Sequence, residues 1–229
     1  MTKIRKYDII DRNNNERRTV MKKTCFIVGS GDFTRRGLTI SHDDFVIAAD
    51  GGYRYLQKIG IKPSLLVGDF DSLDFVPEGI EIFRFPSEKD DTDMGLAIKK
   101  GFDLGYTDFA IYAGSGSRAD HFFANLQLLM RYCERGCNIK MVCPENNVYV
   151  LTKGEITLKQ EKGTVFSVFS LTDTSENVTI KNAKYNLNGA SISNRFPLGV
   201  SNEFMDENVV ISVGEGVILI FEYLSPDYK

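Results

Sequence analysis

The sequence predicts an α/β fold in which an N-terminal, mainly parallel sheet flanked by helices is followed by a C-terminal all-β sandwich. From Cys25 to Cys143, short apolar runs alternate with helical patterns, as they do in successive βαβ units. After Pro144, β-branched runs separated by Gly, Asn and Asp replace that alternation, which is typical of an antiparallel sandwich. A chain of 229 residues, 42% hydrophobic and 26% charged, can bury the core of one large domain or two smaller ones.

The first half is predicted to contain six strands and two long helices. The predicted strands are, in chain order, CFIVGS, DFVIAAD, LLVGDF, IEIFRF, DFAIYAG and IKMVC. Apolar residues at helical spacing predict a helix from Thr92 to Leu104, with Asp91 or Thr92 as its N-cap. The same spacing predicts a second helix from about Asp120 to Arg135, with Gly136 as its stop.

The second half is predicted to contain strands only. Its strand-like runs are VYVLTKGEITL, TVFSVFSL, NVTIKNAKYNL, NVVISV and VILIFEYL. We therefore expect an α/β domain at residues 22–146 and a β-sandwich domain at residues 147–229. Residues 1–21 mix charged and polar side chains without the apolar core of a signal peptide, so we expect a flexible N-terminal extension there.

Composition excludes several classes of partner. The net charge is −3 and the isoelectric point is about 5.5, which gives no overall attraction to nucleic acid or to an anionic membrane. No run of about 18 apolar residues occurs, so we expect no membrane-spanning segment. The four cysteines form no C-x-x-C pair, and reduced thiols in a cytoplasmic protein are the expectation.

Two acidic residues follow the third predicted strand. Asp69 and Asp71 follow the apolar run Leu65-Leu66-Val67 after one glycine, so they are expected at the carboxyl edge of a parallel sheet, where ligands bind in open α/β folds. Residues two apart on an extended chain point the same way. Two carboxylates on one side repel each other unless a cation lies between them, and Mg²⁺ takes one or two protein carboxylates together with water and substrate phosphate.

Further acidic residues lie at two other predicted strand or helix ends. Asp90, Asp91 and Asp93 occur in EKDDTDMGL at a predicted helix start, where helix capping accounts for one or two of them. Asp50 ends the second strand and precedes Gly51-Gly52. The glycines allow a ligand to approach the backbone or a tight turn into a helix, and the alternative role for the aspartate is an N-cap.

The segment AGSGSRADHFFANLQLL combines a glycine turn with polar residues at a helix start. The turn Gly114-Ser115-Gly116, followed by a helix N-terminus, is typical of a phosphate cradle. Arg118 either neutralises phosphoryl oxygens or forms a surface ion pair, and His121 beside Asp120 is more often an orienting residue than an acid or base. No G-x-x-x-x-G-K-[ST] motif occurs, and GSGDF lacks the full G-x-G-x-x-G fingerprint, so neither a P-loop nor a nicotinamide site is expected.

Taken in this order, the motifs resemble those of the thiamine pyrophosphokinase family from about Cys25 to Tyr223. The segments that carry the resemblance are ADGG, VGDFDSL, EKDDTD, GSRADHFFANLQLL and GVSNEF. The resemblance implies transfer of the pyrophosphoryl group of ATP to the hydroxyl of thiamine, giving thiamine diphosphate and AMP. It also implies Mg²⁺ as cofactor, an N-terminal catalytic domain that binds the nucleotide, a C-terminal domain that binds thiamine, and a homodimer with active sites at the subunit interface.

The resemblance also implies roles for residues at matching positions. The implied magnesium ligands are Asp69, Asp71 and Asp93, with Asp50 nearby. The residues implied to contact the nucleotide phosphates or orient the reacting groups are Lys89, Thr92, Arg118 and Asp120. The residues implied to bind thiamine are Ser201 and Asn202. Either Asp71 or Asp120 would accept the hydroxyl proton, and because the chain has no tryptophan, Tyr185 or Phe204 would stack on the thiamine rings instead.

Two other functions fit part of the sequence. In a haloacid-dehalogenase-type phosphatase, Asp69 of DFDSL would attack phosphorus and Asp71 would act as acid and base, but that chemistry needs a later lysine and acidic pair at other spacings. A nucleotide or thiamine-compound sensing module would keep the fold without turnover. The complete acidic set argues against loss of catalysis.

Overall fold

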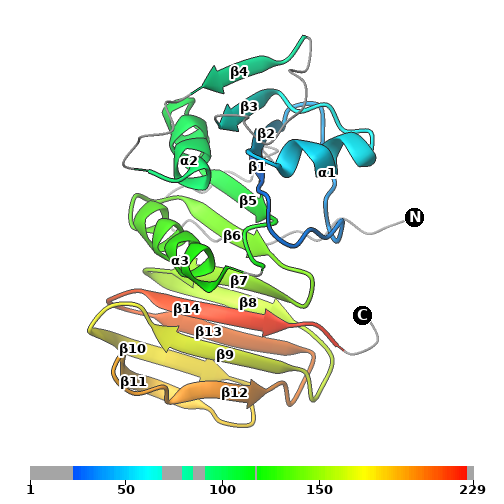
Figure 1. The fold of residues 1–229 in the computed structure, drawn as a ribbon. Coiled ribbons are helices and arrows are strands. Elements are labelled where there is room, and N and C mark those ends of the chain that lie inside the picture. Colours follow the sequence, from blue (N-terminus) through cyan, green and yellow to red (C-terminus); the bar gives the residue numbers. More distant parts are fainter. Residues whose placement is uncertain (1–22, 69–78, 85–90, 117, 226–229) are drawn as a thin grey trace, which may run out of the picture.

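The computed structural model describes residues 23–68, 79–84, 91–116 and 118–225. The predicted extension at residues 1–21 lies outside them. The described strands form one ten-stranded and one four-stranded sheet (Figure 1). In spatial order the large sheet contains β12 (Gly199–Glu203), β9 (Val165–Ser170), β14 (Ile218–Tyr223), β7 (Asn146–Leu151), β6 (Asn138–Val142), β5 (Asp108–Tyr112), β1 (Thr24–Val28), β2 (Phe45–Ala49), β3 (Leu65–Gly68) and β4 (Glu81–Arg84). The small sheet contains β11 (Leu187–Ser193), β10 (Thr174–Lys181), β13 (Asn208–Val213) and β8 (Gly154–Lys159).

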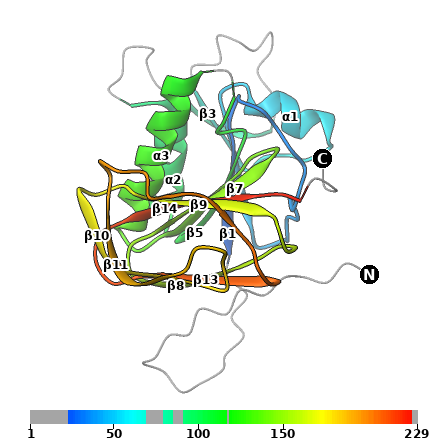
Figure 2. The same ribbon diagram turned by 90° about the horizontal axis from the view of Figure 1, so that it is seen from below.

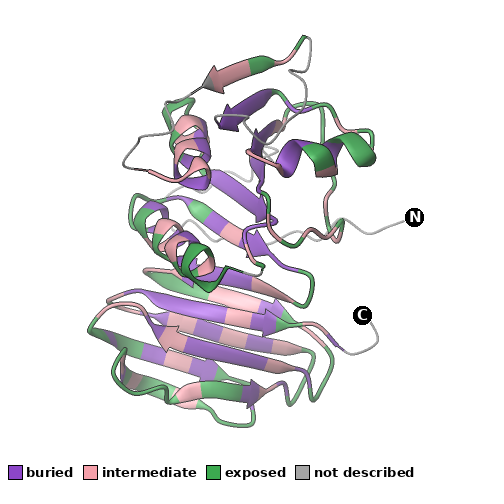
Figure 3. Ribbon diagram, viewed as in Figure 1, coloured by how far each residue is buried: buried purple, intermediate pink, exposed green. Residues whose placement is uncertain are grey.

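The mixed α/β architecture is confirmed, with a parallel sheet in the first half. Strands β4, β3, β2, β1, β5 and β6 pair in parallel. The chain runs outward from β1 to β4 and returns to β5 on the other side of β1, so the strand order reverses between β1 and β5. Two helices, α2 (Asp93–Asp103) and α3 (Ala119–Cys133), pack on one face of this sheet. Helix α1 (Gly52–Lys58) packs on the other face. Figure 3 shows the central parallel strands as mostly buried, which explains their continuous apolar runs.

The second half differs from an independent sandwich because most of its first layer extends the first sheet. Strand β7 pairs antiparallel with β6 on one side and with β14 on the other, and β9 and β12 follow. The small sheet packs on one face of this extension (Figure 2). The large sheet continues into the second half because β6 and β7 are joined by a tight hairpin, in which the N–H of Cys143 donates to the carbonyl of Asn146 at 2.9 Å. The proposed boundary at 146/147 falls inside β7, and division into two domains there stays a prediction.

The helix ends follow local sequence signals. Helix α2 has Thr92 as its N-cap, and the Thr92 hydroxyl oxygen accepts the N–H of Gly95 at 3.0 Å, as predicted. Helix α3 ends in a turn in which Gly136 has a φ of 86° and donates its N–H to the carbonyl of Cys133 at 2.9 Å. The N-cap of α1 is Gly51, so the alternative role of Asp50 as an N-cap is wrong.

The described residues bear on membrane insertion and on the state of the cysteines. None of their helices is both long enough and apolar enough to cross a bilayer. All four cysteines are buried and free, and burial raises the pKa of the Cys25 thiol to about 12. That thiol is therefore a packing group rather than a nucleophile.

Candidate functional site

Two of the predicted acidic residues lie beside the end of β3. A Cβ built on Gly68, the last residue of β3, would lie 3.4 Å from the backbone N and Cα of Asp50 and 3.8 Å from Oδ1 of Asp93. The N–H of Asp50 donates to the carbonyl of Val67 at 2.8 Å. Asp50 has a φ of 50°, a left-handed conformation that costs a non-glycine residue energy and that clusters at functional sites. The structure thus brings Asp50 and Asp93 together at the residue that precedes Asp69.

The remaining predicted ligands of this edge lie outside the described residues. These are the predicted magnesium ligands Asp69 and Asp71; Lys89, predicted at the phosphates, and Asp90 of the acidic cluster also lie outside them. The roles of Asp69, Asp71 and Lys89 stay predictions. Within the described part of the chain, no group of three or more His, Cys, Asp or Glu side chains is close enough to hold a metal ion. Asp93 offers a carboxylate oxygen, a hard donor, close to Gly68, the residue that precedes Asp69 in the sequence. This donor chemistry fits Mg²⁺.

The loops that follow β1 and β5 are paired at the point where the strand order reverses. The N–H groups of Gly31 and Asp32 donate to the carbonyls of Ala113 and Ser115 at 2.9 and 2.7 Å. A Cβ on Gly31 would lie 1.9 Å from the Ser115 carbonyl oxygen, so only glycine permits this approach. Ligands bind at such reversal points in open α/β sheets, which places the predicted phosphate turn at the expected edge.

Arg118 and Asp120 form a bidentate ion pair at the start of α3. Arg118 Nη2 lies 2.5 Å from Asp120 Oδ2, and Arg118 Nε donates to Asp120 Oδ1 at 3.2 Å. Both side chains are about two-thirds exposed, at 67% and 65%. The hydrogen bond from Arg118 lowers the pKa of Asp120 to about 2. The ion pair that was the alternative interpretation of Arg118 is therefore present, and the Arg118 side chain is also largely exposed.

Ser201 lines a cavity of about 560 Å³ on the face of β9, β12 and β14. It has a φ of 55°, and its N–H donates to Ser167 Oγ at 3.1 Å. The lining residues are Gly163, Thr164, Val165, Ser167, Phe169, Val200, Ser201, Phe221, Tyr223 and Leu224. No charged side chain belongs to this described lining. The cavity is suited to a flat, largely apolar group with a few hydrogen-bonding atoms.

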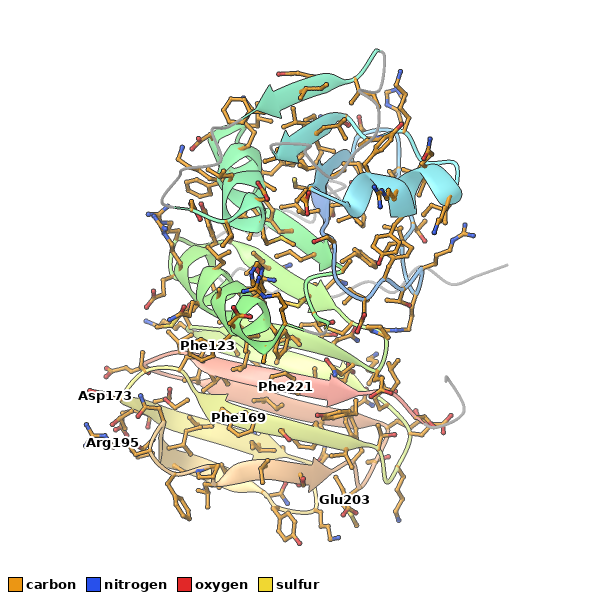
Figure 4. All side chains as sticks on the ribbon, in the orientation of Figure 1. Phe123, Phe169, Asp173, Arg195, Glu203 and Phe221 are labelled. Carbon is orange, nitrogen blue, oxygen red and sulfur yellow. The ribbon has the colours of Figure 1, made fainter. Side chains whose placement is uncertain are left out.

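Aromatic rings form part of this cavity that the sequence reasoning missed. The rings of Phe169 and Phe221 meet edge to face with centroids 6.0 Å apart, and Tyr223 is 39% exposed beside them. Figure 4 shows Phe169 and Phe221 over the strands of the large sheet, with Phe123 of α3 above them. The alternation of Val165, Ser167 and Phe169 is visible in the sequence, but nothing in it shows that this face of the strand stays open.

Asn202 and the two proposed stacking residues lie in different surroundings. Asn202 is only 3% exposed, its Oδ1 accepts the N–H of Tyr185 at 3.0 Å, and its Nδ2 donates to the Tyr185 carbonyl at 2.7 Å. Tyr185 is 61% exposed. Phe204 is fully buried and packs edge to face on Phe166, so the interpretation of Phe204 as a stacking residue is wrong because its ring fills the core between the sheets.

The chain matches known families and structures over most of its length. A family model described as thiamin pyrophosphokinase, catalytic domain, matches residues 37–141, and one described as thiamin pyrophosphokinase, vitamin B1 binding domain, matches residues 153–218. A thiamine pyrophosphokinase of Bacillus subtilis (strain 168) is 28% identical over 213 residues, which cover 86% of this chain and 97% of the relative.

Two crystal structures extend the similarity to the fold. The thiamine pyrophosphokinase from Bacillus subtilis matches with a TM-score of 0.80 and 25% identity, covering 89% of this chain and 100% of that one. A thiamin pyrophosphokinase family protein from Enterococcus faecalis matches with a TM-score of 0.74 and 27% identity, again covering 89% of this chain and 100% of that one. Both halves of the chain therefore have the same relatives.

Proposed function

The chain belongs to the thiamin pyrophosphokinase family and is a kinase, and from this premise we propose how it transfers the pyrophosphoryl group of ATP to the hydroxyl of thiamine. The products are thiamine diphosphate and AMP. The observation that carries the proposal is the approach of Asp50 and Asp93 at the end of β3. Gly68 ends a strand at the edge of the sheet where ligands bind, and the next residue in the sequence is Asp69.

We propose that Mg²⁺ is the cofactor and that carboxylates of this edge hold it. The proposed ligands are Asp69, Asp71 and Asp93, with Asp50 nearby. When bound, the metal would neutralise negative charge on the phosphate oxygens of ATP. The approach of Asp93 Oδ1 to Gly68 supports this assignment because the next residue in the chain is Asp69.

Cationic and hydroxyl groups at two helix starts are proposed to bind the triphosphate. Thr92 uses its oxygen to accept the N–H of Gly95, and its own O–H proton remains available to donate to a phosphate. Arg118 offers a planar cation that neutralises spreading charge during transfer, and Lys89 is proposed to add a second cation. Asp120 holds the Arg118 side chain through two contacts and is proposed to orient it.

The proposed chemical step is an in-line displacement at the β-phosphorus of ATP. The thiamine hydroxyl oxygen forms the new bond, the bond to the α-phosphate oxygen breaks, and AMP leaves. Asp120 is a weak base because Arg118 stabilises its ionised form. Asp71 is the other candidate acceptor of the hydroxyl proton, and as a magnesium ligand it too would be a weak base.

The cavity beside Ser201 is proposed to bind thiamine. The thiazolium ring carries a permanent positive charge, and the faces of aromatic rings attract cations. The described lining of the cavity has aromatic rings but no carboxylate. The rings of Phe169, Phe221 and Tyr223 support this proposal in a chain without tryptophan. Asn202, which binds the backbone of Tyr185 on both sides, is proposed to position that exposed ring rather than to touch thiamine.

A homodimer with active sites at the subunit interface is also part of the proposal. Eight strand spacings separate β12, which carries Ser201, from β3, and at about 4.8 Å per spacing this is roughly 40 Å along the sheet. Within one chain, thiamine at Ser201 would lie too far from the acidic edge for its hydroxyl to reach ATP. Two copies packed through the open sheet face bring one copy's cavity to the other's acidic edge. A cytoplasmic location, favoured by the free cysteines, completes the proposal.

The direct test measures products with Mg²⁺ present or chelated, in wild type and Asp71→Ala. We expect equal amounts of AMP and thiamine diphosphate from ATP and thiamine, dependence on Mg²⁺, and loss of turnover in the variant. Asp103→Ala is the matched control because Asp103 lies at the far end of α2 and contacts Lys99 at 2.6 Å. Near-normal turnover in Asp71→Ala would contradict the metal site.

Other outcomes of the same assay identify the rival functions. ADP together with thiamine monophosphate would indicate a simple kinase. Tight ATP binding without product would indicate the sensing module, and a phosphoenzyme trapped on Asp69 would indicate the phosphatase.

A further inference from the structure

We propose that Asn125 of α3 is a positioning residue that fixes the turn Gly114–Gly116, so that backbone N–H groups of this turn hold a phosphate of the nucleotide. The inference rests on the proposed function, since it concerns the nucleotide end of the same site. Asn125 is only 8% exposed, and its Nδ2 donates to the carbonyl of Gly114 at 2.7 Å.

Three consecutive carbonyls of the turn are held by the protein. The carbonyl of Ala113 accepts the N–H of Gly31 at 2.9 Å, and that of Ser115 accepts the N–H of Asp32 at 2.7 Å. The Gly114 carbonyl between them has Asn125 as its donor. The loop after β1 therefore fixes the two outer peptides, and the helix side chain fixes the middle one.

The orientation of the N–H groups follows from the carbonyls. No cis peptide bond is present in the described residues, and in a trans peptide the C=O and the following N–H point in opposite directions. Because the Ala113 and Ser115 carbonyls both point to the loop after β1, the N–H groups of Gly114 and Gly116 both point away from it. Two parallel donors separated by one residue form a binding site suited to phosphate oxygens.

These donors have no partner within the described part of the chain. The N–H groups of Gly114 and Gly116 donate to no backbone or side-chain acceptor there, although Gly114 is buried. Buried backbone N–H groups without an acceptor are rare in proteins, because desolvating one costs free energy. An anion at the turn would satisfy both, and the turn leads directly into the N-terminus of α3, whose dipole favours negative charge.

The middle peptide depends on Asn125 because its carbonyl points away from the loop after β1. Without the donor at Gly114, the turn could rotate about its glycines, which have low barriers to new backbone conformations. The N–H groups would then lose their common direction. Asn125 thus acts through the backbone and need not touch the nucleotide.

The test compares Asn125→Leu and Asn125→Asp with the wild type, using KM for ATP, KM for thiamine and the melting temperature. For Asn125→Leu we expect KM for ATP to rise about tenfold or more, while KM for thiamine stays within about twofold. The ionised carboxyl of Asn125→Asp would repel the Gly114 carbonyl, whereas its protonated form donates an O–H in place of the amide. Burial raises the pKa of such a carboxyl. The ratio of KM for ATP between this variant and wild type should therefore fall as the pH is lowered from 8 to 6, and the ratio for Asn125→Leu should not.

Leu129→Ala is the control for loss of stability alone. Leu129 is fully buried one turn further along α3, so this variant weakens the packing of the same helix without removing a donor from the turn. If Asn125→Leu does not fold, Asn125→Ser is compared with the wild type in its place. Unchanged KM for ATP in both Asn125 variants, equal rises in both KM values, or the same selective rise in Leu129→Ala would overturn the inference. Failure of the proposed function is a separate result, because wild type would then form no AMP and thiamine diphosphate.

Discussion

Asp120 is held in its ionised form by the neighbouring guanidinium. Two contacts from Arg118 stabilise the carboxylate, and its pKa falls to about 2 from an ordinary value near 4. Because the folded-state pKa is the lower one, this ion pair is complete above the ordinary carboxyl range and weakens only as the pH falls through about 2. An acceptor of the thiamine proton needs a pKa closer to the working pH. The residue is better suited to orienting Arg118.

Asp120→Asn should therefore lower activity without removing an ionisation from the pH–rate profile. We expect kcat/KM to fall about tenfold at each pH between 5.5 and 9, with the shape of the profile preserved, because the amide still contacts Arg118 but no longer pairs with its charge. Glu134→Gln, at the exposed C-cap of the same helix, should match wild type. Disappearance of the acidic limb in Asp120→Asn would instead identify Asp120 as the base.

The place of a single residue was predicted correctly where it depends on neighbouring residues in the sequence. Asp50 and Asp93 were predicted at the sheet edge because each follows or begins a recognisable element. The proposed role of Asn125 was not predicted, because the sequence does not distinguish a buried asparagine with a role at the site from one that only packs in the core. Phe204 was misinterpreted because the sequence of β12, which contains Ser201 and ends one residue before Phe204, shows no signal for which face the second sheet covers.

The start of α2 combines capping with proposed phosphate binding in one side chain. Thr92 caps the helix through its oxygen, and loss of an N-cap typically costs about 1 kcal/mol of unfolding free energy. Aspartate is an equally good cap, but its charge repels a phosphate. Substitutions at this position can therefore separate the stability of the element from the function of the site.

Thr92→Ala should lower the free energy of unfolding by about 1 kcal/mol and raise KM for ATP. Thr92→Asp should recover the stability, yet raise KM for ATP by at least about tenfold, since a tenfold change corresponds to about 1.4 kcal/mol of lost binding. Thr92→Ser keeps the hydroxyl and should match wild type in both chemical denaturation and kinetics. A Thr92→Asp variant with wild-type KM for ATP would show that Thr92 only caps the helix.

Elements with local signals were predicted better than their assembly. Helices α2 and α3 follow apolar spacing and terminal residues that lie next to each other in sequence. The continuity of the large sheet depends on β6 pairing with β7 and on β14 and β9 adding to it. That pairing is set by a hairpin and by strands whose paired residues are 48 to 77 positions apart, and alternation within one strand does not specify its neighbour.

At the scale of the molecule, the ten-stranded sheet separates the two proposed binding ends. The acidic residues lie near β3, and the cavity lies at β9, β12 and β14. Exposed apolar residues lie in and just before β12, whose Val200 and Ser201 line the cavity: Phe196, Leu198 and Val200 are 66%, 53% and 52% exposed. Monomeric proteins rarely leave such a group in water without a function. A second copy that covers this face would also complete the site.

A shared site predicts that two inactive variants restore each other when their subunits are exchanged. Asp93→Ala removes a proposed ligand at the acidic edge, and Ser201→Arg fills the cavity and repels the thiamine cation. Each homodimer should be inactive. After mixing in equal amounts with subunit exchange, half of the dimers pair one copy of each, and one of the two sites in such a dimer contains neither substitution. About one quarter of wild-type activity should therefore return. The control is the double variant carrying both changes in one chain, which should stay inactive when mixed with either single variant. If each site were built within one chain, no mixture would recover activity, because every chain would carry one defect.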